Sequence, residues 1–210
     1  MVDKVKKALL KEKYKDERVF VLPSTDVTTI PDLFTRDQGD GSFNFNQYDD
    51  KGTFIYRYDA EGNGAFQQII PYVLIYNPKT KKFFVSLRTK QSGEQRLYDK
   101  ISLGFGGHIN PCDGPSNIIW KGLVRELTEE VIINQSITFY YKGTIRNITS
   151  ELNDHLGFVF VAEAEDVSIK ETDKLIGQWM SVQELIDNYL KLEDWAKFIV
   201  DYMYAHNNEL

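Results

Sequence analysis

The residues best suited to chemistry lie between Arg125 and Ile133, in the segment RELTEEVII. On an α-helix successive residues turn by about 100°, so Glu126, Glu129 and Glu130 would fall within an arc of roughly 100°. Such a carboxylate face could bind a divalent cation. It could also be a solvated helix face, because like charges one turn apart cost only about 0.2–0.5 kcal/mol per pair and Arg125 can recover as much from Glu129. The segment alone leaves both interpretations open.

The chain that precedes this helix favours a cation site. The strand-like run KISLGF leads into Gly106, Gly107 and His108, and a loop rich in proline and glycine follows. Glycines at the end of a strand permit tight turns and let the backbone approach a ligand closely. Gly122 lies in the acidic arc, where the missing side chain would leave room for an approaching group. A loop folded over the carboxylates would form an oxygen-rich pocket, which suits Mg²⁺ or Mn²⁺.

The elements around the helix indicate how it is positioned. We expect the helix to run from about Ser116 to Ile132 and to be buried against a sheet by five apolar residues: Trp120, Leu123, Val124, Leu127 and Val131. The runs FQQIIPYVLIYN, KKFFVSLRT, SITFYYKGTIRN and HLGFVFVAEAE predict strands of that sheet. Ser181 and Glu184 form a capping-box pattern that opens a helix, and an amphipathic segment follows. Strands on both sides of a central helix predict an α/β layered domain.

A boundary between two parts of the chain is expected near residue 65. Residues 66–210 contain the most regular patterns and should form the core domain with its C-terminal helices. Residues 1–65 combine an amphipathic helix, a strand at RVFVLP and a Gly-, Asp- and Asn-rich stretch with embedded aromatic residues. Linkers rarely contain so many aromatic residues, so we expect an ordered N-terminal lobe packed on the domain.

Composition argues against several classes of protein. The 210-residue chain has a formal net charge of −6 and a pI near 5.2, whereas a surface that grips nucleic-acid phosphates is usually basic. The single cysteine, Cys112, forms no intramolecular disulfide and fits a reducing compartment. No apolar run of about 18 residues predicts a membrane span, and the first residues lack the pattern of a signal peptide. We expect a cytoplasmic protein with neither a membrane nor a DNA partner.

The segment that begins at Gly107 resembles the signature of the Nudix hydrolases, written G-x5-E-x7-R-E-U-x-E-E-x-G-U with U apolar. Gly107 takes the place of the first glycine, Arg125–Glu130 match the central part, and Ile133 takes the last apolar position. The runs RYDAEGNGAFQQIIPYVLIY and GEQRLYDKISLGFGGHI also resemble a bacterial Nudix subgroup called predicted phosphoesterases. The family resemblance implies a Nudix-type α/β/α sandwich with a mixed β-sheet, from about residue 66 to 205.

Three features depart from the signature. Asp113 stands where the first glutamate belongs, the gap from Asp113 to Arg125 is four residues longer than usual, and Ile132 replaces the terminal glycine. The first two concern the acidic loop, and the third concerns the turn after the helix. They keep open a second interpretation, a catalytically weak or inactive Nudix-like module that binds a nucleotide or a protein partner. A third interpretation retains the metal site but performs another diphosphate reaction, such as an isomerisation.

The resemblance also implies a reaction and a set of site residues. Nudix hydrolases use Mg²⁺ or a similar cation to cleave the pyrophosphate bond of a nucleoside diphosphate that is linked to another group. Glu126, Glu129 and Glu130 would bind the metal, together with the carbonyl of Gly106. Arg125 would orient the glutamates, and these four side chains would form the catalytic set.

Substrate contacts are expected near the two glycines. Arg88 and Lys90 could neutralise substrate phosphates, or they could be ordinary surface charges. Gly107 and His108 would line the same place, although His108 could equally have a structural role, as could His155. The general base is expected either on the helix or among four acids that the sequence does not rank: Glu151, Asp154, Glu163 and Glu165. Aromatic residues near the C-terminus would fit either a core or a homodimer contact.

Overall fold

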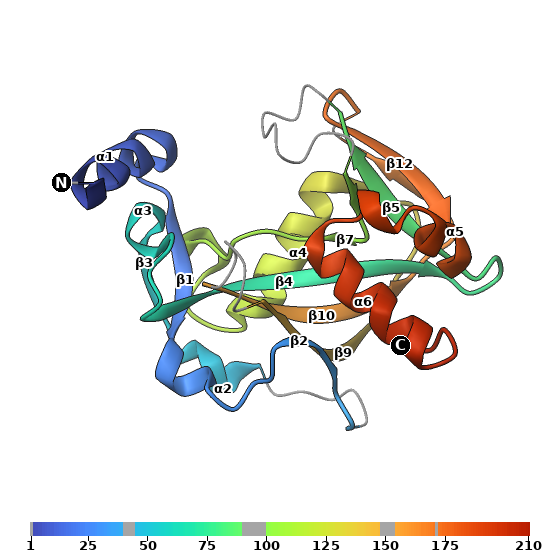
Figure 1. The fold of residues 1–210 in the computed structure, drawn as a ribbon, viewed down its shortest axis with the longest axis horizontal. Coiled ribbons are helices and arrows are strands. Elements are labelled where there is room, and N and C mark those ends of the chain that lie inside the picture. Colours follow the sequence, from blue (N-terminus) through green and yellow to red (C-terminus); the bar gives the residue numbers. More distant parts are fainter. Residues whose placement is uncertain (1, 40–44, 90–99, 148–153, 171) are drawn as a thin grey trace.

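A mixed β-sheet is the largest element of the computed structural model, which describes residues 2–39, 45–89, 100–147, 154–170 and 172–210 (Figure 1). Its strands are β1 (Arg18–Pro23), β2 (Leu33–Arg36), β3 (Thr53–Tyr56), β4 (Phe66–Asn77), β5 (Lys82–Arg88), β6 (Ile101–Ser102), β7 (Gly104–Phe105), β9 (Phe139–Arg146), β10 (His155–Glu163) and β12 (Leu175–Met180). The main order is β12-β5-β4-β10-β9-β2, with β1 and β7 paired to β4, β3 to β1, and β6 to β5. A separate small sheet consists of β8 (Val131–Ile133) and β11 (Val167–Ile169).

Helices pack against the sheet and at its margins. They are α1 (Val2–Tyr14), α2 (Asn46–Asp49), α3 (Arg57–Ala60), α4 (Ile118–Glu130), α5 (Val182–Asp187) and α6 (Asp194–Ala205), and short 3₁₀ turns cover Ser24–Val27, Pro111–Asp113 and Tyr189–Lys191. No helix in the described part of the chain is both long and apolar enough to cross a membrane.

The central strand β4 separates two hydrophobic cores. Ile69 and Val73 belong to the core that includes Leu123 of α4, whereas Ile70 and Leu74 belong to the core formed with α5 and α6. Side chains alternate between the two faces of a strand, so these neighbours along β4 point to opposite sides of the sheet. Helix α4 therefore covers one face and α6 the other (Figure 1). The predicted α/β/α sandwich with a mixed sheet is confirmed.

The pairing of β4 with β10 aligns the two strands at their N-terminal ends. They run parallel in a register that begins at His155↔Gln68 and ends at Glu163↔Tyr76, whereas β1, β5 and β7 all pair antiparallel with β4. The start of β10 therefore lies beside the start of β4, next to β1.

The N-terminal residues contribute strands to the same sheet. Strand β1 pairs with β4 from Val21↔Gln68 to Pro23↔Phe66, and β2 pairs with β9 from Leu33↔Arg146 to Arg36↔Gly143. Strands from both sides of residue 65 thus form one sheet, and the boundary near residue 65 stays a prediction.

The buried face of α4 differs from the expected one. Trp120 is 41% exposed and Val124 is 38% exposed, so the prediction that they bury the helix was wrong. The buried stripe instead follows an i, i+4 pattern of Ile119, Leu123 and Leu127. Because this stripe packs against the sheet, Trp120 and Val124 lie on a partly exposed side of the helix.

The end of α4 also differs from the sequence prediction. The helix stops at Glu130, and Val131–Ile133 form β8 instead of a further helical turn. Pairing of β8 with β11 supplies backbone partners that compete with helix continuation. Ile132, at the position where the Nudix signature has glycine, therefore lies in an extended strand and is 44% exposed.

The capping box at the start of α5 is confirmed. The Ser181 hydroxyl accepts a hydrogen bond from the Glu184 N–H at 3.2 Å, and the Glu184 carboxylate accepts one from the Ser181 N–H at 2.7 Å. These hydrogen bonds from Ser181 hold the pKa of Glu184 at about 2, below its ordinary value of 4.5.

We expect Glu184→Gln to flatten the acid side of the stability profile. Between pH 4.5 and about 2, the unfolded chain binds a proton at Glu184 that the folded chain does not bind. The contribution to stability is therefore present above pH 4.5 and is lost as the pH falls towards 2. The free energy of unfolding, measured in urea at about pH 5 and about pH 3, should fall further in the wild type than in the variant. Equal falls would contradict this assignment.

Candidate active site

Arg125 connects the carboxylates of α4 to the loop that precedes the helix. Its Nε and Nη2 donate to the two carboxylate oxygens of Asp113 at 2.9 and 3.0 Å, and its Nη1 donates to Glu126 at 2.7 Å and to Glu129 at 3.4 Å. Nη2 also donates to the carbonyl of His108 at 2.8 Å. The hydrogen bond with Asp113 raises the pKa of Arg125 above its ordinary value, so the guanidinium is charged. The two hydrogen bonds from Arg125 to Asp113 form a bidentate fork, which fixes both the position and the orientation of the guanidinium.

Asp113, which stands at the sequence position of the signature's first glutamate, forms an ion pair with Arg125. Its side chain is only 3% exposed, and in addition to Arg125 it accepts a hydrogen bond from the Asn110 N–H at 2.8 Å. The shorter side chain reaches Arg125 because it lies at the end of the 3₁₀ turn Pro111–Asp113. In this chain the aspartate is therefore long enough to pair with Arg125.

The lengthened loop after Asp113 is anchored by the N-terminal part of the chain. Asp49 accepts hydrogen bonds from the N–H groups of Asn117 at 2.6 Å and Ile118 at 3.4 Å, at the start of α4. A carboxylate at this position satisfies helix N–H groups that have no partner within the helix and interacts favourably with the helix dipole. Asp49, which the sequence did not suggest, thus stabilises the entry to α4.

The glycines of the loop permit close packing. A side chain at Gly106 would collide with the carbonyl of Pro71 on β4, and one at Gly107 would collide with the carboxylate of Glu126. Gly122 has a different role from the expected one. A Cβ there would lie 2.9 Å from Ile109 and 3.4 Å from Asp113, so the loop itself fills the space that was expected to admit a ligand.

The three glutamates of the helix differ in their surroundings. Glu126 and Glu130 are partly buried, whereas the side chain of Glu129 is 59% exposed. Burial raises the pKa of Glu126 above its ordinary value of 4.5, although the hydrogen bond from Arg125 opposes this shift. The helix thus presents one carboxylate held in the loop and one open to solvent.

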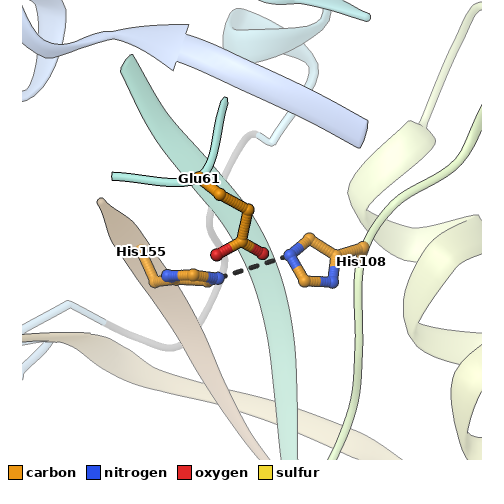
Figure 2. Close-up of side chains that lie close together, drawn as sticks. All are labelled: Glu61, His108 and His155. Carbon is orange, nitrogen blue, oxygen red and sulfur yellow. Dashed lines mark hydrogen bonds between the residues drawn. The ribbon is translucent and has the colours of Figure 1, made fainter. Parts of the chain in front are cut away.

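A second polar cluster lies on the other side of the same loop. The side chains of Glu61, His108 and His155 point towards one another (Figure 2), and their ligand atoms all lie within 4.8 Å of one another. The Nε2 atoms of the two histidines are 3.3 Å apart. Glu61 follows α3, His108 follows the glycine pair, and His155 begins β10, so the fold brings together three segments distant in sequence.

Asp154 and Gln68 orient the histidines. Asp154 accepts hydrogen bonds from His155 Nδ1 at 2.8 Å, the Gly62 N–H at 2.6 Å and Gln68 Nε2 at 3.1 Å. Gln68 Oε1 lies 2.9 Å from His108 Nε2. Burial raises the pKa of Asp154, but the hydrogen bonds from His155 and Gly62 outweigh it and lower the pKa below 3.8. Burial also holds the pKa of His108 well below 6.5, so its imidazole is neutral.

The remaining predicted site residues lie elsewhere or outside the described residues. Arg88 forms an ion pair with Glu193 at 3.1 Å, just before α6. Glu163 and Glu165 lie at the far end of β10 from His155, roughly 26 Å away along a nine-residue strand. Two predicted residues, Lys90 and Glu151, fall outside the described residues.

Glu61, Gln68 and Asp49 are the site residues that sequence reasoning missed. Glu61 and Gln68 lie in the run that resembles the Nudix subgroup, but that resemblance assigns them no role, and the site partners of all three residues are distant in the chain. The two histidines could be noticed singly, but their proximity depends on the parallel register of β4 and β10.

An α/β/α sandwich whose sheet-packed helix carries Arg-Glu-x-x-Glu-Glu beneath a glycine loop is the arrangement expected of a Nudix hydrolase. The chain is 31% identical, over 204 aligned residues, to protein YmaB of Bacillus subtilis (strain 168), and the alignment covers 89% of this chain and 97% of YmaB. No family profile matches the chain.

Solved structures agree with this class. Tm1382, a protein classed with the Nudix hydrolases, superimposes with a TM-score of 0.72 at 28% identity, covering 90% of this chain and 99% of Tm1382. DR0079 from Deinococcus radiodurans superimposes with a TM-score of 0.56 at 12% identity over 90% of this chain and 99% of its own, which shows a shared fold. The chain belongs to the Nudix hydrolase family.

The residues of the α4 site fit a hard divalent cation. Three carboxylates, Glu126, Glu129 and Glu130, lie within a little more than one helical turn, and the loop closest to them carries no side chain at Gly107. Oxygen donors of this kind match the preferences of Mg²⁺ and Mn²⁺. The Arg125 guanidinium holds Glu126 and leaves the more exposed Glu129 only weakly engaged.

We expect Asp113→Asn to destabilise the metal-free protein by about 2–4 kcal/mol, since it removes the buried carboxylate charge that faces Arg125 Nε and Nη2. All three hydrogen-bond partners of Asp113 are N–H donors, so an amide NH₂ would face a donor in either orientation. Glu129→Gln is the matched control, because its pair with Arg125 is exposed and should change stability by less than about 1 kcal/mol. Urea denaturation in EDTA measures both. Similar losses in the two variants would show that the Asp113 fork is not the principal contact.

Proposed function

We propose that the protein is a Mg²⁺- or Mn²⁺-dependent pyrophosphohydrolase that acts on a nucleoside diphosphate linked to another group, or on a related diphosphate. The main support is the Arg125 network, which holds Asp113, Glu126 and the carbonyl of His108 in one arrangement. This network keeps the carboxylates beside the glycine loop despite the departures from the signature. The single cysteine suits a reducing compartment, and we place the protein in the cytoplasm.

Each residue of the site has a proposed role. Glu126, Glu129 and Glu130 hold the cation, with the carbonyl of Gly106 as a further ligand. A bound Mg²⁺ or Mn²⁺ would neutralise phosphate charge and orient the diphosphate. Arg125 is a positioning residue, because its hydrogen bonds go to Glu126 and to the loop rather than towards open solvent.

The substrate would approach over the glycine loop. Gly107 packs directly against the Glu126 carboxylate, so a phosphate bound along this backbone would lie next to a proposed metal ligand. His108 is the next residue, and its backbone would line the same edge. Arg88 would have to leave Glu193 before it could contact a phosphate.

A carboxylate of the helix is the better candidate for the general base. Asp154 already accepts three hydrogen bonds, from Gly62, Gln68 and His155, and Glu165 pairs with Lys79 at the far end of β10. Glu129 is the most exposed of the helix carboxylates and is only weakly held by Arg125. An exposed carboxylate can reach a water molecule at the loop, as a general base must.

The proposal is tested with a panel of substrates in Mg²⁺ or Mn²⁺. The panel should contain dinucleotides, nucleotide sugars, nucleoside triphosphates, and capped and prenyl diphosphates, and phosphate release and products should be followed. We expect turnover of at least one member and a loss of about 100-fold or more in Glu126→Gln, Glu129→Gln and Glu130→Gln. Changes in the outer contacts of a metal ligand already cost about 10–100-fold, and these variants alter the ligands themselves.

Glu165→Gln is the matched control, because it removes an exposed carboxylate far from the loop and should retain full activity. Absence of turnover, or helix glutamate variants as active as the wild type, would refute the proposal that the protein is a hydrolase. Tight binding of a panel member without turnover would instead identify a binding module, and a product of unchanged mass would identify an isomerase.

A further inference from the structure

We propose that Glu61, His108 and His155 form a second metal site, for a Zn²⁺-like transition-metal ion, distinct from the carboxylate site on α4. The three side chains converge from the segment after α3, the glycine loop and the first residue of β10 (Figure 2). Two imidazoles and a carboxylate are ligands that zinc commonly takes, whereas Mg²⁺ prefers oxygen ligands alone.

The spacing of the imidazoles suits a shared ion. Two nitrogens that each lie 2.0–2.1 Å from a tetrahedral zinc are about 3.3–3.4 Å apart. The Nε2 atoms of His108 and His155 are 3.3 Å apart. The carboxylate of Glu61 lies within 4.8 Å of both ligand atoms, and a small rotation of this partly exposed side chain would complete the set.

Hydrogen bonds around His155 direct a lone pair into the cluster. A carboxylate oxygen of Asp154 only accepts, so His155 Nδ1 carries the proton of their 2.8 Å hydrogen bond. In the neutral imidazole, His155 Nε2 then carries the lone pair, and this atom faces His108. A carboxylate that orients a ligating histidine in this way is the usual outer contact of a zinc site.

The surroundings of His108 contain more lone pairs than protons. Gln68 donates its amide to Asp154, so its carbonyl oxygen faces His108 Nε2 at 2.9 Å. His155 Nε2 also faces this atom, and the Glu61 carboxylate lies close by. A single proton on His108 Nε2 cannot satisfy all of these acceptors, but a cation in its place can.

The contacts of Glu61 leave an oxygen for the ion. Arg57 Nε donates to Glu61 Oε1 at 2.9 Å, and the carboxylate has a second oxygen. Arg57 also pairs with Glu17 at 3.1 Å, so its charge is shared between two acids. The Arg57 guanidinium therefore orients the Glu61 carboxylate, and Glu61 Oε2 could still bind the ion.

The position of the site indicates a structural role. Glu61 belongs to the N-terminal residues, and His108 directly follows Gly107, which packs against Glu126. The carbonyl of His108 accepts a hydrogen bond from Arg125. An ion held by these ligands would fasten the N-terminal segment to the loop of the carboxylate site and to the first residue of β10.

Zinc binding to the full chain tests the proposal independently of hydrolysis. The protein is stripped with EDTA, desalted and titrated with Zn²⁺ against a chromophoric chelator, in excess Mg²⁺ to occupy the carboxylate site. We expect one equivalent of Zn²⁺ to bind. Glu61→Gln and His155→Asn should each weaken binding by at least about tenfold, because each removes a ligand. The asparagine can still donate to Asp154, which preserves that hydrogen bond.

His206→Ala is the matched control. His206 is the remaining histidine of the chain, it is exposed, and it directly follows α6. It should bind Zn²⁺ as the wild type does, and so should Glu129→Gln. Circular dichroism establishes that each variant is folded, and the visible spectrum of the Co²⁺-loaded protein reports imidazole ligation directly. If His155→Asn fails to fold, the partly exposed Glu61 still provides the test.

Several results would overturn the proposal. They are no binding by the wild type, unchanged affinity in Glu61→Gln, or an equal loss in His206→Ala. Any of them would mean that His108 and His155 are a hydrogen-bonded pair that binds no metal. Loss of hydrolysis in Glu129→Gln with zinc binding retained would separate the two sites, so the failure of one proposal would not decide the other.

Discussion

The ion pair between Arg125 and Asp113 is the interaction on which the arrangement of the site depends. Arg125 is on α4 and Asp113 is at the end of the preceding turn, so their fork fixes the loop relative to the helix. The same guanidinium also donates to Glu126 on α4 and to the carbonyl of His108 in the loop. A charged donor that is partly buried needs such partners, because an unpaired buried charge is costly. The loop conformation is therefore set by the need to satisfy one guanidinium.

The sheet supplies the rigid support for this loop. Strand β7 runs antiparallel to β4, and Gly106 then passes so close to the Pro71 carbonyl that a side chain would collide with it. The path of the backbone along β4 brings His108 to Gln68, at the start of the strand, while the parallel register places His155 there as well. Both clusters thus depend on the same central strand, although they use different faces of the loop.

The sequence predicted the regular parts of this fold and missed those that depend on tertiary contacts. The runs for β4 and β10 and the Ser181 capping box were recognisable because each is a local pattern with a local cause. Strand β2 was missed because its four residues form a strand only by pairing with β9. The end of α4 was placed too late, since β-branched residues at 131–133 continue the apolar pattern of the helix while pairing with β11 decides their conformation. For the site, the carboxylates of α4 were evident from spacing, whereas Glu61 reaches its partners only through the fold.

The two clusters share one residue in a way that couples them physically. The carbonyl of His108 accepts from Arg125, and its imidazole faces His155 and Gln68. A shift of this residue towards one cluster would lengthen its hydrogen bonds in the other, because both sets of hydrogen bonds are made by the same residue. Ordering of the imidazole side therefore also orders the carbonyl that Arg125 uses. Two residues of the N-terminal part of the chain support this site. Asp49 caps the start of α4, and Glu61 lies beside His108 and His155.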